Sequence, residues 1–90
     1  MAVIVRIPTT MRPLSGGAST IEVAPGTLGD VIAELEQKHP GFAERLLEDG
    51  ALRRFVNVFV DDDDVRYLDG LETKVPDGQT VSIIPAVAGG

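Results

Sequence analysis

A single amphipathic helix with strand-forming residues on both sides is the feature that most constrains the fold of this chain. Thr27 is expected to cap the helix, and Asp30 stands at the position that completes a capping box. Pro40 disfavours helical geometry in the residue before it, so the helix must end by His39. One apolar stripe of the helix faces a core, and it consists of Leu28, Val31, Ile32 and Leu35. A lone helix of this kind needs a sheet to lie across.

Alternating apolar and polar residues predict the strands of that sheet. The predicted strands are residues 2–7, 20–23, 54–61, 65–68 and 80–84. Residues 9–18 have no period and are expected to form a loop, and residues 42–47 a short second helical turn. The order is strand, strand, helix, strand, short strand, strand, in which the first and last strands can pair in parallel at the centre. This order predicts an α+β, β-grasp (ubiquitin-like) fold, with a mixed sheet of about five strands and one main helix across it.

Composition limits the classes of function. The chain of 90 residues fits one small domain, which we place at residues 1–85, followed by a flexible tail at 86–90. No cysteine is present, which excludes disulfides, thiolate metal sites and cysteine nucleophiles. The net charge of −6 disfavours binding to nucleic acid. The first residues do not resemble a signal peptide and no segment predicts a membrane span, so we expect a cytoplasmic protein.

Three groups of residues are candidates for a functional role within the domain. His39 is the only histidine and is expected to be a favourable neighbour of the helix dipole, because no partner for acid–base work is implied. Four consecutive acids at residues 61–64 predict a solvated turn, with a weak cation site or a contact with a basic partner as alternatives. Phe55 and Phe59 share one face of the strand at 54–61. They are expected to lie either in the core or on a partner-binding surface.

The chain ends in a proline, three small apolar residues and two glycines. Pro85 has no N–H to donate, so strand pairing should weaken there. The five residues beyond it reach roughly 17 Å when fully extended. Such a tail fits a narrow enzyme channel, because glycine allows a partner's backbone to approach closely. The alternative is an ordinary frayed terminus.

Three segments of the chain resemble the ThiS/MoaD family of sulfur carriers. Residues 27–35 are similar to the capped helix start of that family, residues 77–85 to its last turn and strand, and residues 86–90 to its tail. Residues 7–9, the long loop at 9–18, residues 55–58 and the chain end are most similar to the cysteine-biosynthesis carriers, the CysO branch. Ala86 stands where many molybdopterin-type carriers have a second proline, which argues against that branch.

The resemblance implies a protein co-substrate rather than an enzyme. An E1-like adenylating enzyme would use ATP and a sulfide source to convert the Gly90 carboxylate, through an adenylate, into a thiocarboxylate. Gly89, Ala88 and Val87 would give the tail its clearance, and Phe55 and Phe59 would contribute to the docking surface. The cysteine branch further implies a pyridoxal-phosphate-dependent cysteine synthase and a zinc peptidase of the JAMM type as partners. The carrier itself is expected to need no bound cofactor, no metal and no catalytic side chain.

Three other functions remain open at this level. The first is that of a ubiquitin-like modifier, which is joined to lysines of target proteins through the same activated glycine. The second is that of a fixed small subunit of an enzyme such as molybdopterin synthase. The third alternative is a β-grasp binding module whose tail is inert.

Overall fold

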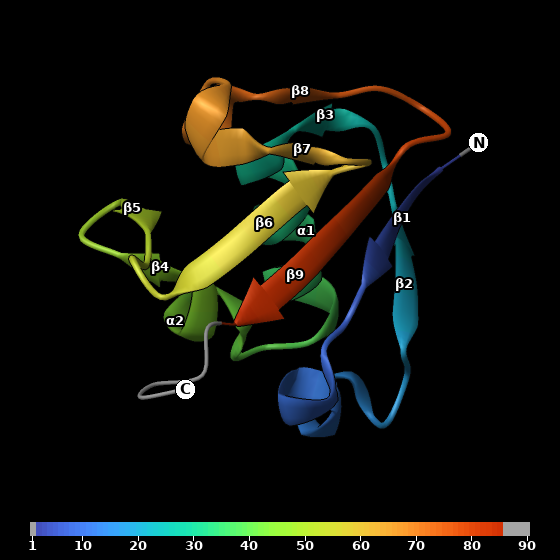
Figure 1. Cartoon of the computed structure of the whole chain (residues 1–90). Helices are drawn as coiled ribbons and strands as arrows, with labels where there is room; N and C mark the ends of the chain where they lie inside the picture. Colours follow the sequence, from blue (N-terminus) through green and yellow to red (C-terminus); the bar gives the residue numbers. More distant parts are fainter. Residues whose placement is uncertain (1, 86–90) are drawn as a thin grey trace.

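The computed structural model describes residues 2–85, and within that range one long helix crosses a five-stranded mixed sheet (Figure 1). The order of the strands in this sheet is β2-β1-β9-β6-β7. These strands are β1 (Val3–Arg6), β2 (Thr20–Val23), β6 (Val56–Val60), β7 (Asp63–Asp64) and β9 (Thr80–Pro85).

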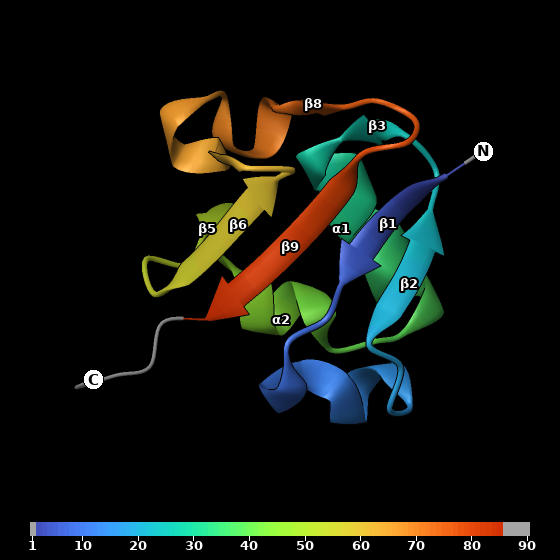
Figure 2. The ribbon, with the colours of Figure 1, turned by 45° about the vertical axis from the view of Figure 1, so that its right-hand side comes forward.

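The first and last strands of the sheet are parallel neighbours. Strand β9 pairs in parallel with β1 and antiparallel with β6, and β1 pairs antiparallel with β2 (Figure 2). The predicted central parallel pair, with the N-terminal hairpin on one side and the third strand on the other, is therefore confirmed.

The long helix α1 (Leu28–Lys38) begins and ends where its capping residues predict. The Thr27 hydroxyl accepts a hydrogen bond from the Asp30 N–H at 3.1 Å, and the Asp30 carboxylate accepts one from the Thr27 N–H at 3.1 Å. At the other end, His39 is the C-cap and its N–H donates to the Leu35 carbonyl at 2.8 Å. The capping box and the structural place of His39 are both confirmed.

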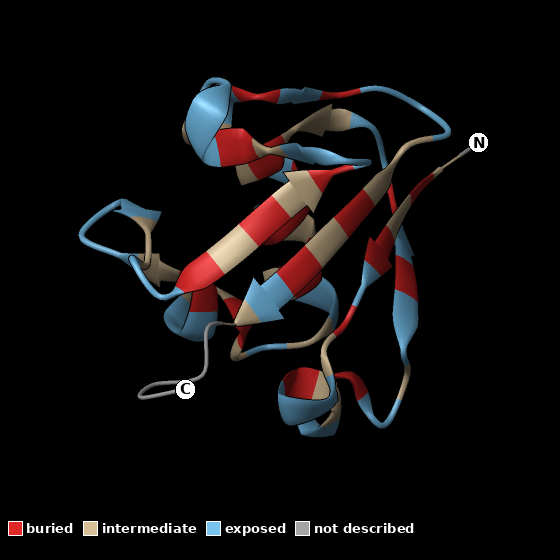
Figure 3. Ribbon diagram, viewed as in Figure 1, coloured by how far each residue is buried: buried red, intermediate tan, exposed pale blue. Residues whose placement is uncertain are grey.

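The core lies between α1 and one face of the sheet. Along β6 and β9 buried residues alternate with more exposed ones, as Figure 3 shows. The short helix α2 (Phe42–Leu46) closes one end of the core with two fully buried side chains, Phe42 and Leu46. The core itself contains buried side chains from both the helix and the sheet, among them Val3, Val5, Leu28, Val31, Leu35, Val58 and Val81.

Short elements complete the fold. The minor strands are β3 (Gly26–Thr27), β4 (Leu47–Glu48), β5 (Ala51–Leu52) and β8 (Lys74–Val75). The turn at Asp49 and Gly50, both at positive φ, joins β4 and β5 into a hairpin. Strand β3 pairs with β8, which the sequence did not predict. No helix within residues 2–85 has the length and apolar character needed to cross a membrane.

Two predicted segments differ in the structure. Residues 9–18 are not a plain loop, because a 3-10 helix, η1 (Thr9–Ser15), fills most of them. The strand predicted at residues 65–68 is wrong: a 3-10 helix, η2 (Val65–Tyr67), occupies this segment, and η3 (Gly70–Glu72) follows it. The Asp64 side chain accepts a hydrogen bond from the Arg66 N–H at 2.9 Å. Such a local cap stabilises a helical turn at the expense of strand pairing.

Candidate functional site

The predicted reactive residue Gly90, with Gly89, Ala88 and Val87, lies outside the described residues. The described part of the site therefore begins at Pro85, the last residue of β9. The Cα partner of Pro85 is Val56, at the start of β6. The root of the tail is thus fixed beside the first residue of a neighbouring strand.

The face of the sheet opposite α1 carries apolar side chains next to this root. Phe59 lies opposite Ser82, and Asn57 lies opposite Ile84, on the outward-facing positions of β6 and β9. Phe59 is half-buried, whereas Ile84 keeps 49% of its surface exposed. Cross-strand neighbours on one face are close enough to form a continuous surface.

Phe55 lies outside the core, in the turn that precedes β6. Its side chain is 64% exposed. The turn spans residues 53–56 and is closed by a hydrogen bond from the Val56 N–H to the Arg53 carbonyl at 3.1 Å. Since Val56 pairs with Pro85, Phe55 lies at the end of β6 from which the tail leaves. Of the two aromatic candidates, Phe55 is the one available to a partner over most of its surface.

The sequence prediction missed Ile84 as a member of this surface. In the strand register Ile84 is diagonal to Phe59 and lies on the same side of the sheet, one residue from Pro85. Ile83 and Ile84 are adjacent in a strand, so one of the two must face away from the core. Ile83 is buried and Ile84 is exposed. The apolar pair was therefore a signal that one isoleucine would be displayed.

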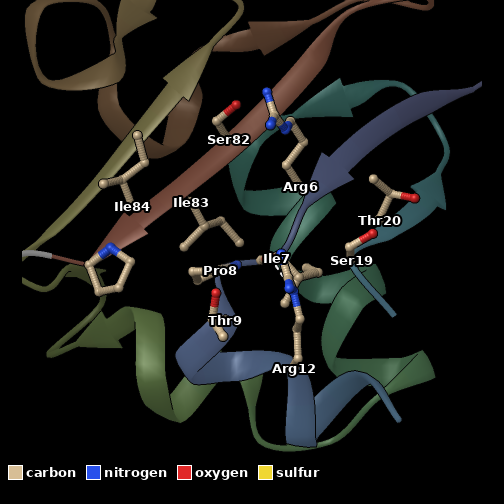
Figure 4. Close-up of a pocket in the computed structure, with 11 residues that line it drawn as sticks. Arg6, Ile7, Pro8, Thr9, Arg12, Ser19, Thr20, Ser82, Ile83 and Ile84 are labelled. Carbon is tan, nitrogen blue, oxygen red and sulfur yellow. Dashed lines mark hydrogen bonds between the residues drawn. The ribbon is translucent and has the colours of Figure 1, made fainter. Parts of the chain in front are cut away.

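A pocket of about 530 Å³ opens beside the same root. Figure 4 shows Arg6 on β1 with its guanidinium directed toward Ser82, and Arg12 on η1 with its side chain directed toward Ile7; Ser19 and Thr20 lie on the side away from the β9 residues. The remaining lining residues are Ile7, Pro8, Thr9, Ser82, Ile83, Ile84 and Pro85. The sequence did not single out either arginine, because they come from separate elements.

The other candidate residues do not form a catalytic cluster. Asp61 accepts a hydrogen bond from the Thr80 N–H at 3.0 Å, while Asp64 caps η2, so the run of acids serves different backbone groups. Among residues 2–85 no group of three metal-ligating side chains comes together. The His39 ring meets Phe42 edge-to-face with centroids 6.5 Å apart. These contacts are structural.

The electrostatic feature with a clear physical cause lies on α1, away from the tail. The Glu34 carboxylate accepts a hydrogen bond from the Ala24 N–H at 3.0 Å and forms an ion pair with Lys38 at 3.1 Å. The Ala24 hydrogen bond and then the Lys38 contact lower the pKa of Glu34. This carboxylate joins the helix to the end of β2.

This chain is similar to known proteins over most or all of its length. The ThiS family profile matches residues 5–90. The sulfur carrier protein CysO of Mycobacterium tuberculosis is 48% identical over 93 residues, covering all of both chains. The Amycolatopsis orientalis BexX/CysO complex contains a chain that superposes with a TM-score of 0.95 at 46% identity, covering 99% of this chain and 100% of that one. Small archaeal modifier protein 3 of Haloferax volcanii is 47% identical over 64 residues, 71% of this chain and 70% of its own.

Proposed function

Because the chain belongs to the ThiS family, we propose that it is a sulfur carrier activated at its C-terminal Gly90. The predicted β-grasp fold and the predicted likeness to the CysO branch are confirmed by the structural and sequence matches. The observation that carries the proposal is the 48% identity with a sulfur carrier over the full length of both chains.

The proposed chemistry takes place on the terminal carboxylate. An oxygen of the Gly90 carboxylate attacks the α-phosphorus of ATP on an E1-like adenylating enzyme, and pyrophosphate leaves. Sulfide then attacks the acyl carbon of this adenylate, and AMP leaves with the electron pair of the broken bond. The product is a thiocarboxylate on Gly90, which can donate its sulfur. In this scheme the chain is a co-substrate rather than an enzyme, and Gly89, Ala88 and Val87 let the tail enter the active site of the partner.

The sulfur is proposed to be used for cysteine biosynthesis. The support is the similarity to CysO proteins in sequence and structure. The proposed partners are the adenylating enzyme, a pyridoxal-phosphate-dependent cysteine synthase and a zinc peptidase of the JAMM type that releases the product. ATP and the sulfide source are used by the enzyme, and no cofactor is proposed for the carrier.

The docking surface that we propose for these partners consists of Phe55, Phe59 and Ile84. Phe55 and Ile84 are exposed large apolar residues, and Phe59 lies between β7 and β9 on the same face as Ile84. Exposed apolar residues grouped beside a functional terminus favour an interaction site. Within this surface Ile84 is nearest to the root of the tail.

Measuring the intact mass tests the carrier chemistry. The protein is incubated with its E1-like enzyme, ATP and sulfide, beside a variant that lacks Gly90. We expect one oxygen to be replaced by sulfur in the full chain and no change in the truncated one. An unchanged mass with a competent enzyme would contradict the proposal.

A modifier function is the second candidate, supported by the 47% identity with a small archaeal modifier protein. The same activated Gly90 would then be joined to lysines of other proteins. Gly-Gly remnants linked to lysines in peptide digests would support this candidate. Their absence from cells in which the thiocarboxylate accumulates would exclude it.

A further inference from the structure

The pocket beside Pro85 is basic although the chain as a whole is acidic. Two arginines, Arg6 and Arg12, line it, and no acidic residue does. The net charge of the chain is −6. A pocket of opposite sign attracts a group that the rest of the molecular surface repels. The position of the pocket beside Pro85 and its positive charge therefore both indicate what kind of partner group binds there.

Among the residues that the structure describes, neither arginine takes part in an ion pair. The ion pairs found in residues 2–85 join Lys38 to Glu34 and Arg53 to Glu48. Arg6 lies on a central strand, where an opposite charge on a neighbouring strand would be a favourable partner. Its cross-strand neighbours are instead Thr20 and Ser82, which carry hydroxyl groups.

Arg12 is held in position while part of its guanidinium stays free. Its Nε donates to the Ile7 carbonyl at 3.2 Å, and its own carbonyl accepts from the Ser15 hydroxyl at 3.0 Å and the Gly17 N–H at 2.8 Å. Within residues 2–85 its two terminal nitrogens make no hydrogen bond. A guanidinium fixed in this way can bind a carboxylate with little loss of side-chain freedom.

Hydroxyl groups complete the recognition chemistry of the pocket. Thr9, Ser19, Thr20 and Ser82 line it together with the two arginines (Figure 4). Hydroxyls and guanidinium groups all donate hydrogen bonds to carboxylate oxygens. The lining therefore matches an Asp or Glu side chain better than an apolar or basic one.

The pocket lies directly beside the residue from which the tail begins. Pro85 is part of its lining, and residues 86–90 follow directly in the chain. Resting on the function proposed above, we propose that the adenylating partner places an acidic segment in the pocket between Arg6 and Arg12. Because other parts of this acidic chain repel such a segment, the contact orients the carrier with its tail toward the active site. Contacts of this kind affect encounter and orientation more than the chemical step.

The first test uses this protein alone with a hexaglutamate peptide as the probe. NMR signals of the Arg6 and Arg12 side chains, and of the Thr20 and Ser82 amides, are expected to shift on titration, whereas those around Lys74 stay unchanged. Absent shifts, or shifts spread over all basic residues, would overturn the proposal. Inorganic phosphate is the matched probe, and equal shifts with phosphate would overturn it too, because the site would then bind small anions in general.

The second test assigns the partner through steady-state adenylation. We expect Arg6→Gln and Arg12→Gln each to raise the KM for the carrier about tenfold with kcat unchanged, since each variant loses a hydrogen bond to a charged group. Lys74→Gln, which removes one positive charge as each arginine variant does, is the control for net charge. A control effect as large as that of the arginine variants, or arginine variants that match the wild type, would overturn the proposal. If the wild type is not adenylated, the proposed function fails, and the peptide titration still decides whether the pocket binds acidic segments.

Discussion

Arg66 and Asn57, nine residues apart in the sequence, are joined by a side-chain hydrogen bond of 2.8 Å from Nη1 to Oδ1. The other terminal nitrogen of Arg66 donates to the carbonyls of Arg53, Arg54 and Val56 at 2.9, 2.7 and 2.7 Å. One side chain of η2 thus holds the turn that displays Phe55. The shape of the proposed docking surface depends on this contact.

Replacing Arg66 should loosen that turn. We expect Arg66→Lys to lose about 1–3 kcal/mol of the free energy of unfolding, because an ammonium cannot reproduce the planar guanidinium fork. Urea unfolding measures the loss, and hydrogen exchange at residues 53–57 should become faster. Arg45→Lys is the control, because the Arg45 side chain makes no hydrogen bond within residues 2–85. Unchanged exchange at the turn would contradict this role.

Phe55→Ser should weaken docking with little effect on folding. Phe55 is 64% exposed, so the free energy of unfolding should change by less than about 0.5 kcal/mol. A central apolar contact of an interface contributes about 2 kcal/mol, which corresponds to a rise of roughly thirtyfold in the KM for adenylation. Tyr67→Ser is the control, because Tyr67 is 87% exposed but lies on η2. Equal effects of the two variants would remove Phe55 from the docking surface.

Thr27→Ala should remove half of the capping box of α1. The expected loss is about 1 kcal/mol of the free energy of unfolding, since the Asp30 N–H loses its acceptor. Thr27→Ser retains the hydroxyl and should keep most of the stability. Thermal and urea unfolding of both variants measure the difference. If the serine variant is as unstable as the alanine variant, the Thr27 methyl group matters rather than the cap.

Glu34 should make the stability of the protein dependent on pH in the acid range. Its pKa is lowered in the folded state from the ordinary value of 4.5, so the unfolded chain binds more protons near that pH. The stabilisation is therefore fully present above pH 4.5 and is lost as the pH falls through the folded pKa.

Comparing Glu34→Gln with the wild type isolates this dependence. The difference in the free energy of unfolding should be largest near neutral pH and should shrink on acidification. Glu44→Gln is the control, because Glu44 is exposed and its carboxylate makes no hydrogen bond within residues 2–85. If the difference in the free energy of unfolding between Glu34→Gln and the wild type does not change with pH, Glu34 is not the source of the pH dependence.

The sequence by itself determined the helix, the main strands and their order. The apolar stripe of α1, the cap at Thr27 and the break at Pro40 are local signals, because each depends on residues within one or two turns. Alternation along 54–61 likewise divided the residues of β6 between two faces, and the structure then showed that Val56, Val58 and Val60 face the core. The resemblance that led to the family rested on short segments of this kind and on the final glycines.

Only the tertiary structure decided the features that depend on strand register and on contacts between distant segments. It placed Ile84, and not Ile83, on the exposed face, because the pairing of β9 with β1 and β6 sets which side of the strand packs against α1. It replaced a predicted strand by η2, whose Arg66 reaches back to the turn before β6. It brought Arg6 and Arg12 into one pocket beside Pro85. No local pattern contains these relationships, because packing of the whole chain around one core fixes them.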